Sequence, residues 1–197
     1  MARKNTRNTR GRIISAAWKL FYEQGYENTT VEDILKESRV SKGTFYHYFD
    51  GKADLLNTLS VLFDDAYEEY QAEMTPDMSA SEALLGSNQY LFRLIEEEVP
   101  ANLMASLFAE QIRTDHYQCL QDRNRMYFQF VREQIERGLA SGEFRTNRTA
   151  EELIALFADL ERGAIYNWLL KRERYSLTEA ARPLVEELLD GFQKGRF

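Results

Sequence analysis

The sequence has one cysteine, two histidines, three prolines and ten glycines among its 197 residues. A single cysteine excludes an internal disulfide, and two distant histidines are a poor basis for a metal site, so we expect neither a metal nor a cofactor. Scarce proline and glycine favour long helices over a turn-rich β fold. No window approaches the roughly 18 uninterrupted apolar residues of a membrane helix, and no secretory apolar segment follows the basic N-terminus. We therefore expect a cytoplasmic protein that does not cross a membrane.

Acidic residues outnumber basic ones by 32 to 25, and a net charge of −7 alone would argue against a nucleic-acid partner. The charge is unevenly distributed, however. Residues 1–52 hold ten basic and six acidic side chains, a net charge of +4, whereas residues 53–197 carry −11. This asymmetry predicts a segment that binds a polyanion, joined to an acidic body. The five basic residues among the first twelve are also typical of a solvated tail.

Apolar residues recur with a helical period along most of the chain, which predicts an all-α fold of about nine helices. The first is expected over residues 10–24. Thr30 and Asp33 have the spacing of a capping box that opens a short second helix, and Ser41 has the position of an N-cap for a third. Two short helices joined by only two residues are typical of a helix-turn-helix.

The rest of the chain is predicted to form longer helices, beginning with one continuous helix from Lys52 to about residue 74. In the helix expected over residues 149–171, the apolar arc is about twice as wide as one core requires. Its second face can be buried within the monomer or covered by a second subunit. We expect a second subunit, because Asp159 and Arg162 on this helix need solvent. The predicted homodimer interface on the last two long helices comprises Ile154, Phe157, Ile165, Leu169, Leu184 and Leu188.

Glu161 falls inside the same apolar arc. An isolated charge in such a position is unfavourable unless it is paired. We therefore expect Glu161 to meet a cation, a ligand or a partner chain.

Residues 40–49, VSKGTFYHYF, are unusually aromatic for a short helix. On a helix that begins at Ser41, Phe45 and Phe49 share one face and can pack inward, whereas Tyr46 and His47 point away from it. Short or flexible side chains at the exposed N-terminal turn suit a helix that enters the major groove of DNA, because they can reach base edges while neighbouring polar groups hold phosphates. That turn comprises Lys42, Gly43 and Thr44.

The segment over residues 27–56, ENTTVEDILKESRVSKGTFYHYFDGKADLL, resembles the TetR family of bacterial transcriptional regulators. The family pattern contains T-V-x-D-I-A, V-S-x-G-T-F/L-Y-x-Y/H-F and a K-x-x-L that opens the fourth helix. The sequence GEF, at residues 142–144, is another common family feature. The resemblance implies a helix-turn-helix DNA-binding domain at residues 1–51 and an effector-binding and dimerisation domain at residues 52–197.

The resemblance also assigns roles to single residues. It implies base reading by Lys42, Gly43 and Thr44, and phosphate contacts by Tyr46, His47 and Lys52. Arg39 departs from the pattern, because the family usually has a glycine there. Either Arg39 adopts the left-handed backbone conformation, or the turn is reshaped. The full predicted DNA-binding set is Thr30, Ser41, Lys42, Gly43, Thr44, Tyr46, His47 and Lys52.

By the same resemblance, we expect a repressor that binds a palindromic double-stranded DNA operator as a homodimer and is released by a small organic effector. Phase along the helices predicts a mixed apolar and polar effector pocket, suited to an aromatic or cationic compound. Its candidate residues are Phe63, Tyr67, Asn88, Phe92, Phe108, His116, Glu161 and Trp168.

Two other classes of function are weighed. His116 and Cys119 can face one another on a helix, as in an enzyme, but no third group of a nucleophilic or metal site is evident, so we expect no catalytic residues. The other class is a DNA-binding activator, or a regulator controlled by a protein partner without a small-molecule effector. The absence of a cavity in the body would favour that class.

Overall fold

The computed structural model describes residues 2–113 and 118–196, with side chains from residue 9 onward. Within these residues there are ten α-helices, one short 3₁₀ helix and no strand, which confirms the predicted all-α fold. The chain forms two compact units. Unit 1 comprises Met1–Val61 and Asn102–Leu120, and unit 2 comprises Leu62–Ala101 and Gln121–Phe197. The functional division at residues 51 and 52 stays a prediction.

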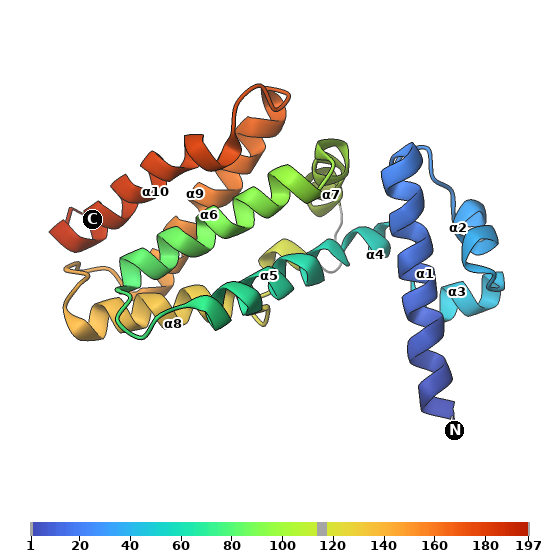
Figure 1. Cartoon of the computed structure of the whole chain (residues 1–197), viewed down its shortest axis with the longest axis horizontal. Helices are drawn as coiled ribbons and strands as arrows, with labels where there is room; N and C mark the ends of the chain where they lie inside the picture. The colour runs from blue at the N-terminus through green and yellow to red at the C-terminus, as the bar shows by residue number, and fades with distance from the viewer. Residues whose placement is uncertain (1, 114–117, 197) are drawn as a thin grey trace. The chain divides into compact units, whose positions relative to one another are not determined.

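Unit 1 is built around a long first helix, α1 (Ala2–Gln24), which packs against α2 (Val31–Ser38). It continues with α3 (Lys42–Tyr48) and α4 (Lys52–Leu56), and it includes most of α7 (Ala101–Arg113) and of the 3₁₀ helix η1 (Cys119–Gln121). Figure 1 shows α2 and α3 alongside α1. The core of this unit consists of fully buried apolar side chains, among them Ile13, Ala17, Phe21, Ile34, Phe45 and Leu55.

Thr30 and Ser41 are the N-cap residues of α2 and α3, as the sequence predicts. The Oγ1 atom of Thr30 accepts a hydrogen bond from the Asp33 N–H at 3.1 Å, and the Asp33 carboxylate accepts one from the Thr30 N–H at 2.9 Å. Ser41 caps α3 by accepting from the Thr44 N–H at 3.1 Å. Each contact satisfies an N–H group that the first turn of a helix leaves free.

The prediction of one continuous helix from Lys52 to residue 74 was wrong. α4 ends at Leu56 and α5 (Leu59–Glu73) begins three residues later. The Thr58 hydroxyl donates to the Leu55 carbonyl at 2.5 Å and accepts from Trp18 Nε1 at 2.9 Å, while Asn57 Oδ1 accepts from Gln111 Nε2 at 3.0 Å. Side chains from α1 and α7 therefore hold the break between α4 and α5.

Unit 2 contains most of α5 together with α6 (Ala80–Glu98), α8 (Met126–Ser141), α9 (Ala150–Leu170) and α10 (Leu177–Lys194). α6 packs against α8 and α10, and α9 packs against the same two helices (Figure 1). The wide apolar arc of α9 is therefore covered mainly within the chain. A second subunit on the remaining exposed surface of α9 stays a prediction.

The GEF sequence joins α8 to two other helices of unit 2. Gly142 ends α8 with a φ of 76°, in the left-handed region that favours glycine. The Glu143 carboxylate accepts hydrogen bonds from the N–H groups of Ala80 and Ser81, each at 2.9 Å, and so caps α6. The ring of Phe144 is buried and lies 5.6 Å from the Phe192 ring of α10.

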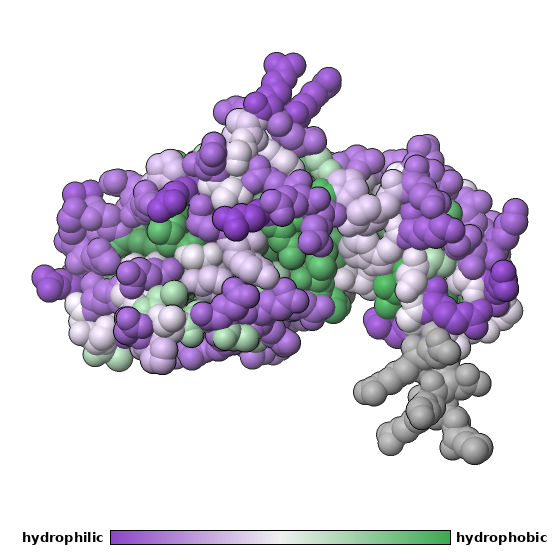
Figure 2. All heavy atoms as spheres, in the orientation of Figure 1, coloured by the Kyte–Doolittle hydropathy of each residue, from purple (hydrophilic) through white to green (hydrophobic). Residues whose placement is uncertain are grey.

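Hydrophilic side chains cover most of the face shown in Figure 2, and hydrophobic residues form smaller patches between them. None of the helices in the described part of the chain has the length and apolarity that crossing a bilayer requires.

Candidate nucleic-acid interface and effector site

The helix α3 has one buried and one exposed face. Phe45 is fully buried and Phe49 is 4% exposed, and their ring centroids lie 5.8 Å apart. Tyr46 is 47% exposed, and His47 is also exposed. The predicted division of this helix into a core face and a free face is confirmed.

The N-terminal turn of α3 is open to the exterior. Lys42 and Gly43 are exposed and Thr44 is half-buried. A Cβ atom added to Gly43 would meet nothing within 4 Å among the described residues beyond its own chain neighbours and helix backbone. The space beside Gly43 is therefore available to another molecule, and the Lys42 ammonium lies 6.0 Å from the Tyr46 ring. Base reading by this turn stays a prediction.

Thr30 and Ser41 lie at the exposed N-termini of α2 and α3. Their hydroxyl oxygens are already used as helix caps, and the Ser41 Oγ lies 2.8 Å from Thr44 Oγ1. A helix N-terminus also favours an anion, because its N–H groups and its dipole point outward. The Thr30 N–H and hydroxyl both donate to the Asp33 carboxylate, at 2.9 and 2.6 Å. Phosphate contacts by Thr30 and Ser41 stay a prediction.

Lys52 is half-buried and has partners within unit 1. Its ammonium donates to the Tyr26 carbonyl at 2.7 Å and lies 4.0 Å from the centre of the Tyr26 ring. Burial lowers the pKa of this ammonium. A phosphate contact by Lys52 stays a prediction, but the contact would have to share the ammonium with Tyr26.

Side chains are described only from residue 9, so three of the five basic residues near the N-terminus, Arg3, Lys4 and Arg7, lie outside the described side chains. Arg10 stacks over Phe49 with its guanidinium carbon 5.4 Å from the ring centre. Arg12 donates from Nη2 to the backbone carbonyls of Ser38 and Arg39. The sequence had given no role to Arg12.

A buried polar cluster in unit 2 joins α6, α8 and α9. Glu161, 4% exposed, accepts from Asn88 Nδ2 at 2.8 Å and from the Tyr127 hydroxyl at 2.7 Å. Burial raises the pKa of the Glu161 carboxyl to about 7, although both hydrogen bonds act in the opposite direction. Within the described residues the hydrogen-bond partners of Glu161 are thus two neutral donors of the same chain, and a cation, ligand or partner chain at Glu161 stays a prediction.

Tyr67 of α5 lies beside this cluster, with its ring 5.4 Å from that of Tyr127. Its hydroxyl is buried and has no hydrogen-bond partner among the described residues. Burial, followed by the charge of Glu161, raises the pKa of both tyrosines well above the usual value. Asn88, Tyr67 and Glu161 of the predicted set therefore lie close together in the core, and Tyr127 is a neighbour that the predicted set lacked.

The other predicted effector residues have varied surroundings. Phe63, Phe92 and Trp168 are buried in unit 2, and the Trp168 indole donates to the Tyr175 carbonyl at 3.0 Å. Phe108 is half-buried in unit 1. His116 lies outside the described residues. Effector binding by this set stays a prediction.

The residues predicted for a dimer interface are mostly buried within the chain. Ile154 and Phe157 are fully buried, Ile165 and Leu188 nearly so, and Leu169 is half-buried. Leu184, 52% exposed, borders a groove between α9 and α10 that small residues line in part. Ile154 and Phe157 thus have no exposed side-chain surface for a partner, and apolar surface remains at Leu184, Tyr166 and Leu170.

Cys119, the sulfur considered for a catalytic site, is buried. In the described residues, no group of three or more His, Cys, Asp or Glu side chains is arranged to hold a metal ion. His116 lies outside the described residues, so nothing is added on the His116 and Cys119 pair.

The family described as bacterial regulatory proteins, tetR family, matches residues 13–59, which include α2, α3 and α4. The chain belongs to the TetR family. The HTH-type transcriptional regulator HbdR of Aromatoleum sp. (strain CIB) is 31% identical over 146 residues, 74% of this chain and 56% of HbdR. This TetR-family chain therefore matches only about half the length of HbdR.

Two solved structures share the fold. Thermus thermophilus FadR, a TetR-family repressor in complex with lauroyl-CoA, is 24% identical with a TM-score of 0.78, over 95% of each chain. Bacillus subtilis FadR in complex with stearoyl-CoA is 22% identical with a TM-score of 0.68, over 91% of this chain and 97% of FadR. At these identities the likeness establishes the TetR fold of this chain and not its ligand.

Proposed function

We propose that this TetR-family chain is a sequence-specific DNA-binding transcriptional repressor that binds a palindromic operator as a homodimer and is released by a small organic effector. The observation that carries the proposal is the division of α3, with Phe45 in the core and the opposite face free. A helix fixed by one aromatic face can hold Lys42, Gly43 and Thr44 against base edges. The net charge of +4 over residues 1–52 supports attraction to the phosphate backbone.

The homodimer is proposed to form through α9 and α10. Leu170, Leu184 and Tyr166 are 61%, 52% and 50% exposed, so these two helices leave apolar and aromatic surface that a second copy could cover. Gly163 and Ala180 on the groove between these helices permit close approach of another helix. Two copies related by a twofold axis would present two α3 helices to half-sites about 34 Å apart, one helical turn of DNA.

Acyl-CoA thioesters are the first effector class to test, because two proteins with this fold are seen with lauroyl-CoA and stearoyl-CoA. The buried aromatic side chains Phe63, Phe92 and Trp168 in unit 2 suit an apolar acyl chain. A cationic effector at Glu161 has less support, because Asn88 and Tyr127 already supply hydrogen bonds to its carboxylate.

The proposal is tested by incubating the purified chain with a pool of random DNA duplexes at low ionic strength and sequencing the enriched fraction. We expect a palindromic sequence, bound by two copies of the chain. Lauroyl-CoA and stearoyl-CoA should release that duplex, whereas free CoA should not. If no sequence is enriched from the pool, the DNA-binding proposal is refuted. If neither thioester releases the duplex, only acyl-CoA thioesters are excluded as the effector class.

A matched pair of variants tests the role of α3. Tyr46 on α3 and Tyr22 on α1 are both 47% exposed. Loss of one hydrogen bond to a phosphate should make Tyr46→Ala bind the enriched duplex about three- to tenfold more weakly. Tyr22→Ala should bind like the wild-type chain in the same fluorescence anisotropy titration. Equal losses in both variants would contradict a specific role for the exposed face of α3.

A further inference from the structure

The turn between α2 and α3 contains a residue in an unfavourable backbone conformation. Arg39 has φ 55° and ψ 43°, in the left-handed region, which is disfavoured for a residue with a Cβ atom. Its N–H donates to the Leu35 carbonyl, and the Val40 N–H donates to the same oxygen at 3.3 Å. Ser41, two residues after Arg39, caps α3. The conformation of Arg39 therefore sets where the recognition helix begins.

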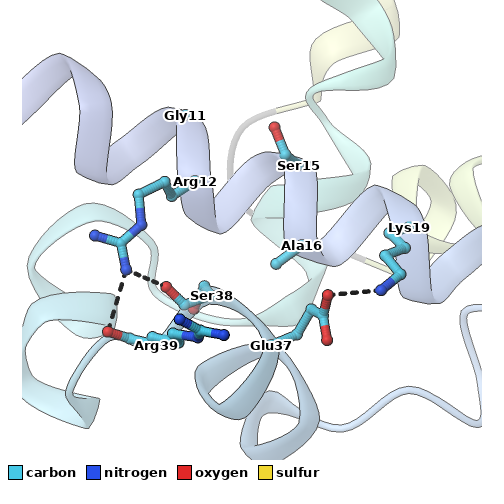
Figure 3. Close-up of a pocket in the computed structure, with 8 residues that line it drawn as sticks. All are labelled: Gly11, Arg12, Ser15, Ala16, Lys19, Glu37, Ser38 and Arg39. Atoms are coloured by element: carbon cyan, nitrogen blue, oxygen red, sulfur yellow. Dashed lines mark hydrogen bonds and ion pairs between the residues drawn. The ribbon is translucent and has the colours of Figure 1, made fainter.

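Arg12, on α1, contacts backbone carbonyl groups of this turn. The carbonyls of Ser38 and Arg39 lie at the C-terminus of α2, where helices leave carbonyl groups without intrahelical partners. Arg12 donates from Nη2 to both oxygens, with 3.2 Å to the Arg39 carbonyl (Figure 3). The guanidinium also places a positive charge at the negative end of the α2 dipole.

Arg12 lines a groove between α1 and α2, and a second contact crosses this groove without reaching the turn. The Lys19 ammonium lies 2.7 Å from the Glu37 carboxylate, and both side chains are substantially exposed, at 53% and 39% (Figure 3). An exposed ion pair of this kind contributes little to stability. Lys19 therefore serves as a matched control for Arg12, because its removal takes one cation from the groove and leaves the turn carbonyls untouched.

We propose that Arg12 is a positioning residue for the recognition helix α3. By binding the Ser38 and Arg39 carbonyls, Arg12 stabilises the left-handed conformation of Arg39, and that conformation fixes the direction in which α3 leaves the turn. The proposal deepens the proposed function, because it rests on α3 being the helix that reads DNA. The effect of Arg12 on DNA affinity is then indirect, through Arg39, and does not require a contact between Arg12 and a phosphate.

The test is a double-mutant cycle with Arg12→Ala, Arg39→Gly and the double variant, measured on the duplex that the wild-type chain enriches from a random pool. Glycine adopts the left-handed conformation without strain, so the turn no longer needs Arg12 when residue 39 is glycine. We expect Arg12→Ala to weaken binding about tenfold in the wild-type background, as the left-handed penalty implies, and less than about twofold in the Arg39→Gly background. Lys19→Ala should change affinity less than about twofold.

Salt dependence separates positioning from direct contact. Loss of one phosphate contact makes the negative slope of log affinity against log salt concentration shallower by about one. The slope should be the same for Arg12→Ala and the wild-type chain. A slope reduced by about one would overturn the proposal, and so would an equal loss of affinity in both backgrounds, because Arg12 would then not act through Arg39.

Amide hydrogen exchange gives a readout that needs no DNA. The Val40 N–H closes the turn on the Leu35 carbonyl. Its exchange should be about tenfold faster in Arg12→Ala and should return to the wild-type rate in the double variant. If no duplex is enriched, the proposed function fails, and the exchange rates still decide whether Arg12 holds the turn. Unchanged exchange in Arg12→Ala would overturn that claim.

Discussion

Replacing Glu161 with glutamine should stabilise the protein at neutral and alkaline pH. The Glu161 carboxyl is buried against Asn88 and Tyr127, and burial raises its pKa to about 7. A carboxyl with a raised folded-state pKa favours folding in its protonated form. Its ionisation therefore weakens the fold as pH rises from the unfolded pKa toward 7, and the full penalty is present above that value.

The size of the effect follows from the shift. Relative to an ordinary glutamate near 4.5, a pKa of about 7 corresponds to a penalty of about 3 kcal/mol at alkaline pH. Between pH 5 and pH 8 the wild-type chain should lose about 2.5 kcal/mol of unfolding free energy through this group. Glutamine has nearly the shape of the protonated acid and does not ionise, so Glu161→Gln should match the wild-type chain near pH 5 and exceed it by about 2–3 kcal/mol at pH 8.

Urea unfolding of both chains at a series of pH values measures this difference directly. Tyr67 and Tyr127 stay neutral in this range because their pKa values are raised. Glu68→Gln, at an exposed carboxylate on α5, is the control and should give a difference that hardly depends on pH. A Glu161→Gln chain that is less stable than the wild type at pH 8, or a constant difference across the series, would refute the reasoning.

Two further variants test other parts of the structure. Leu184→Asp places a charge on the exposed apolar surface of α10 and should convert the proposed dimer into a monomer in sedimentation velocity; an unchanged dimer would move the interface elsewhere. Burial raises the pKa of the Glu143 carboxyl, but the hydrogen bonds from Ser81 and Ala80 outweigh burial and lower the folded-state pKa below the usual value. The ionised carboxylate therefore stabilises the fold at neutral pH, and this stabilisation is lost as the pH falls through the folded-state pKa. Glu143→Gln should therefore lower the unfolding free energy by about 1 kcal/mol at pH 7 and by little at pH 3, whereas an equal loss at both values would exclude the charge as the cause.

The parts of the fold that were predictable from the sequence depend on neighbouring residues. Thr30 and Asp33 are three residues apart, and so are Ser41 and Thr44, so the caps of α2 and α3 can be recognised in a short window. The burial of Phe45 follows from helical period in the same way.

The parts that were missed depend on residues distant in the sequence. The break after α4 is held by Trp18 and Gln111, and the apolar period does not reveal it because the helical phase continues on both sides. The helical period of the sequence around Glu161 predicts that this residue lies in the core. Its hydrogen-bond partner Asn88 is 73 residues away, so a local pattern cannot identify it. Arg39 adopts the first of the two predicted alternatives, the left-handed conformation, and the contact from Arg12 across 26 residues had no signal in the sequence.

Base reading by the first turn of α3 is tested most directly by measuring affinities for the enriched duplex and for its complete set of single base-pair substitutions. The wild-type chain, Lys42→Ala and Thr44→Ala are compared at one salt concentration. Each variant should lose discrimination at one or two positions in each half-site, by about 1–3 kcal/mol, and should rank the other duplexes as the wild type does. If both variants rank all substituted duplexes as the wild-type chain does, the N-terminal turn of α3 does not read the operator.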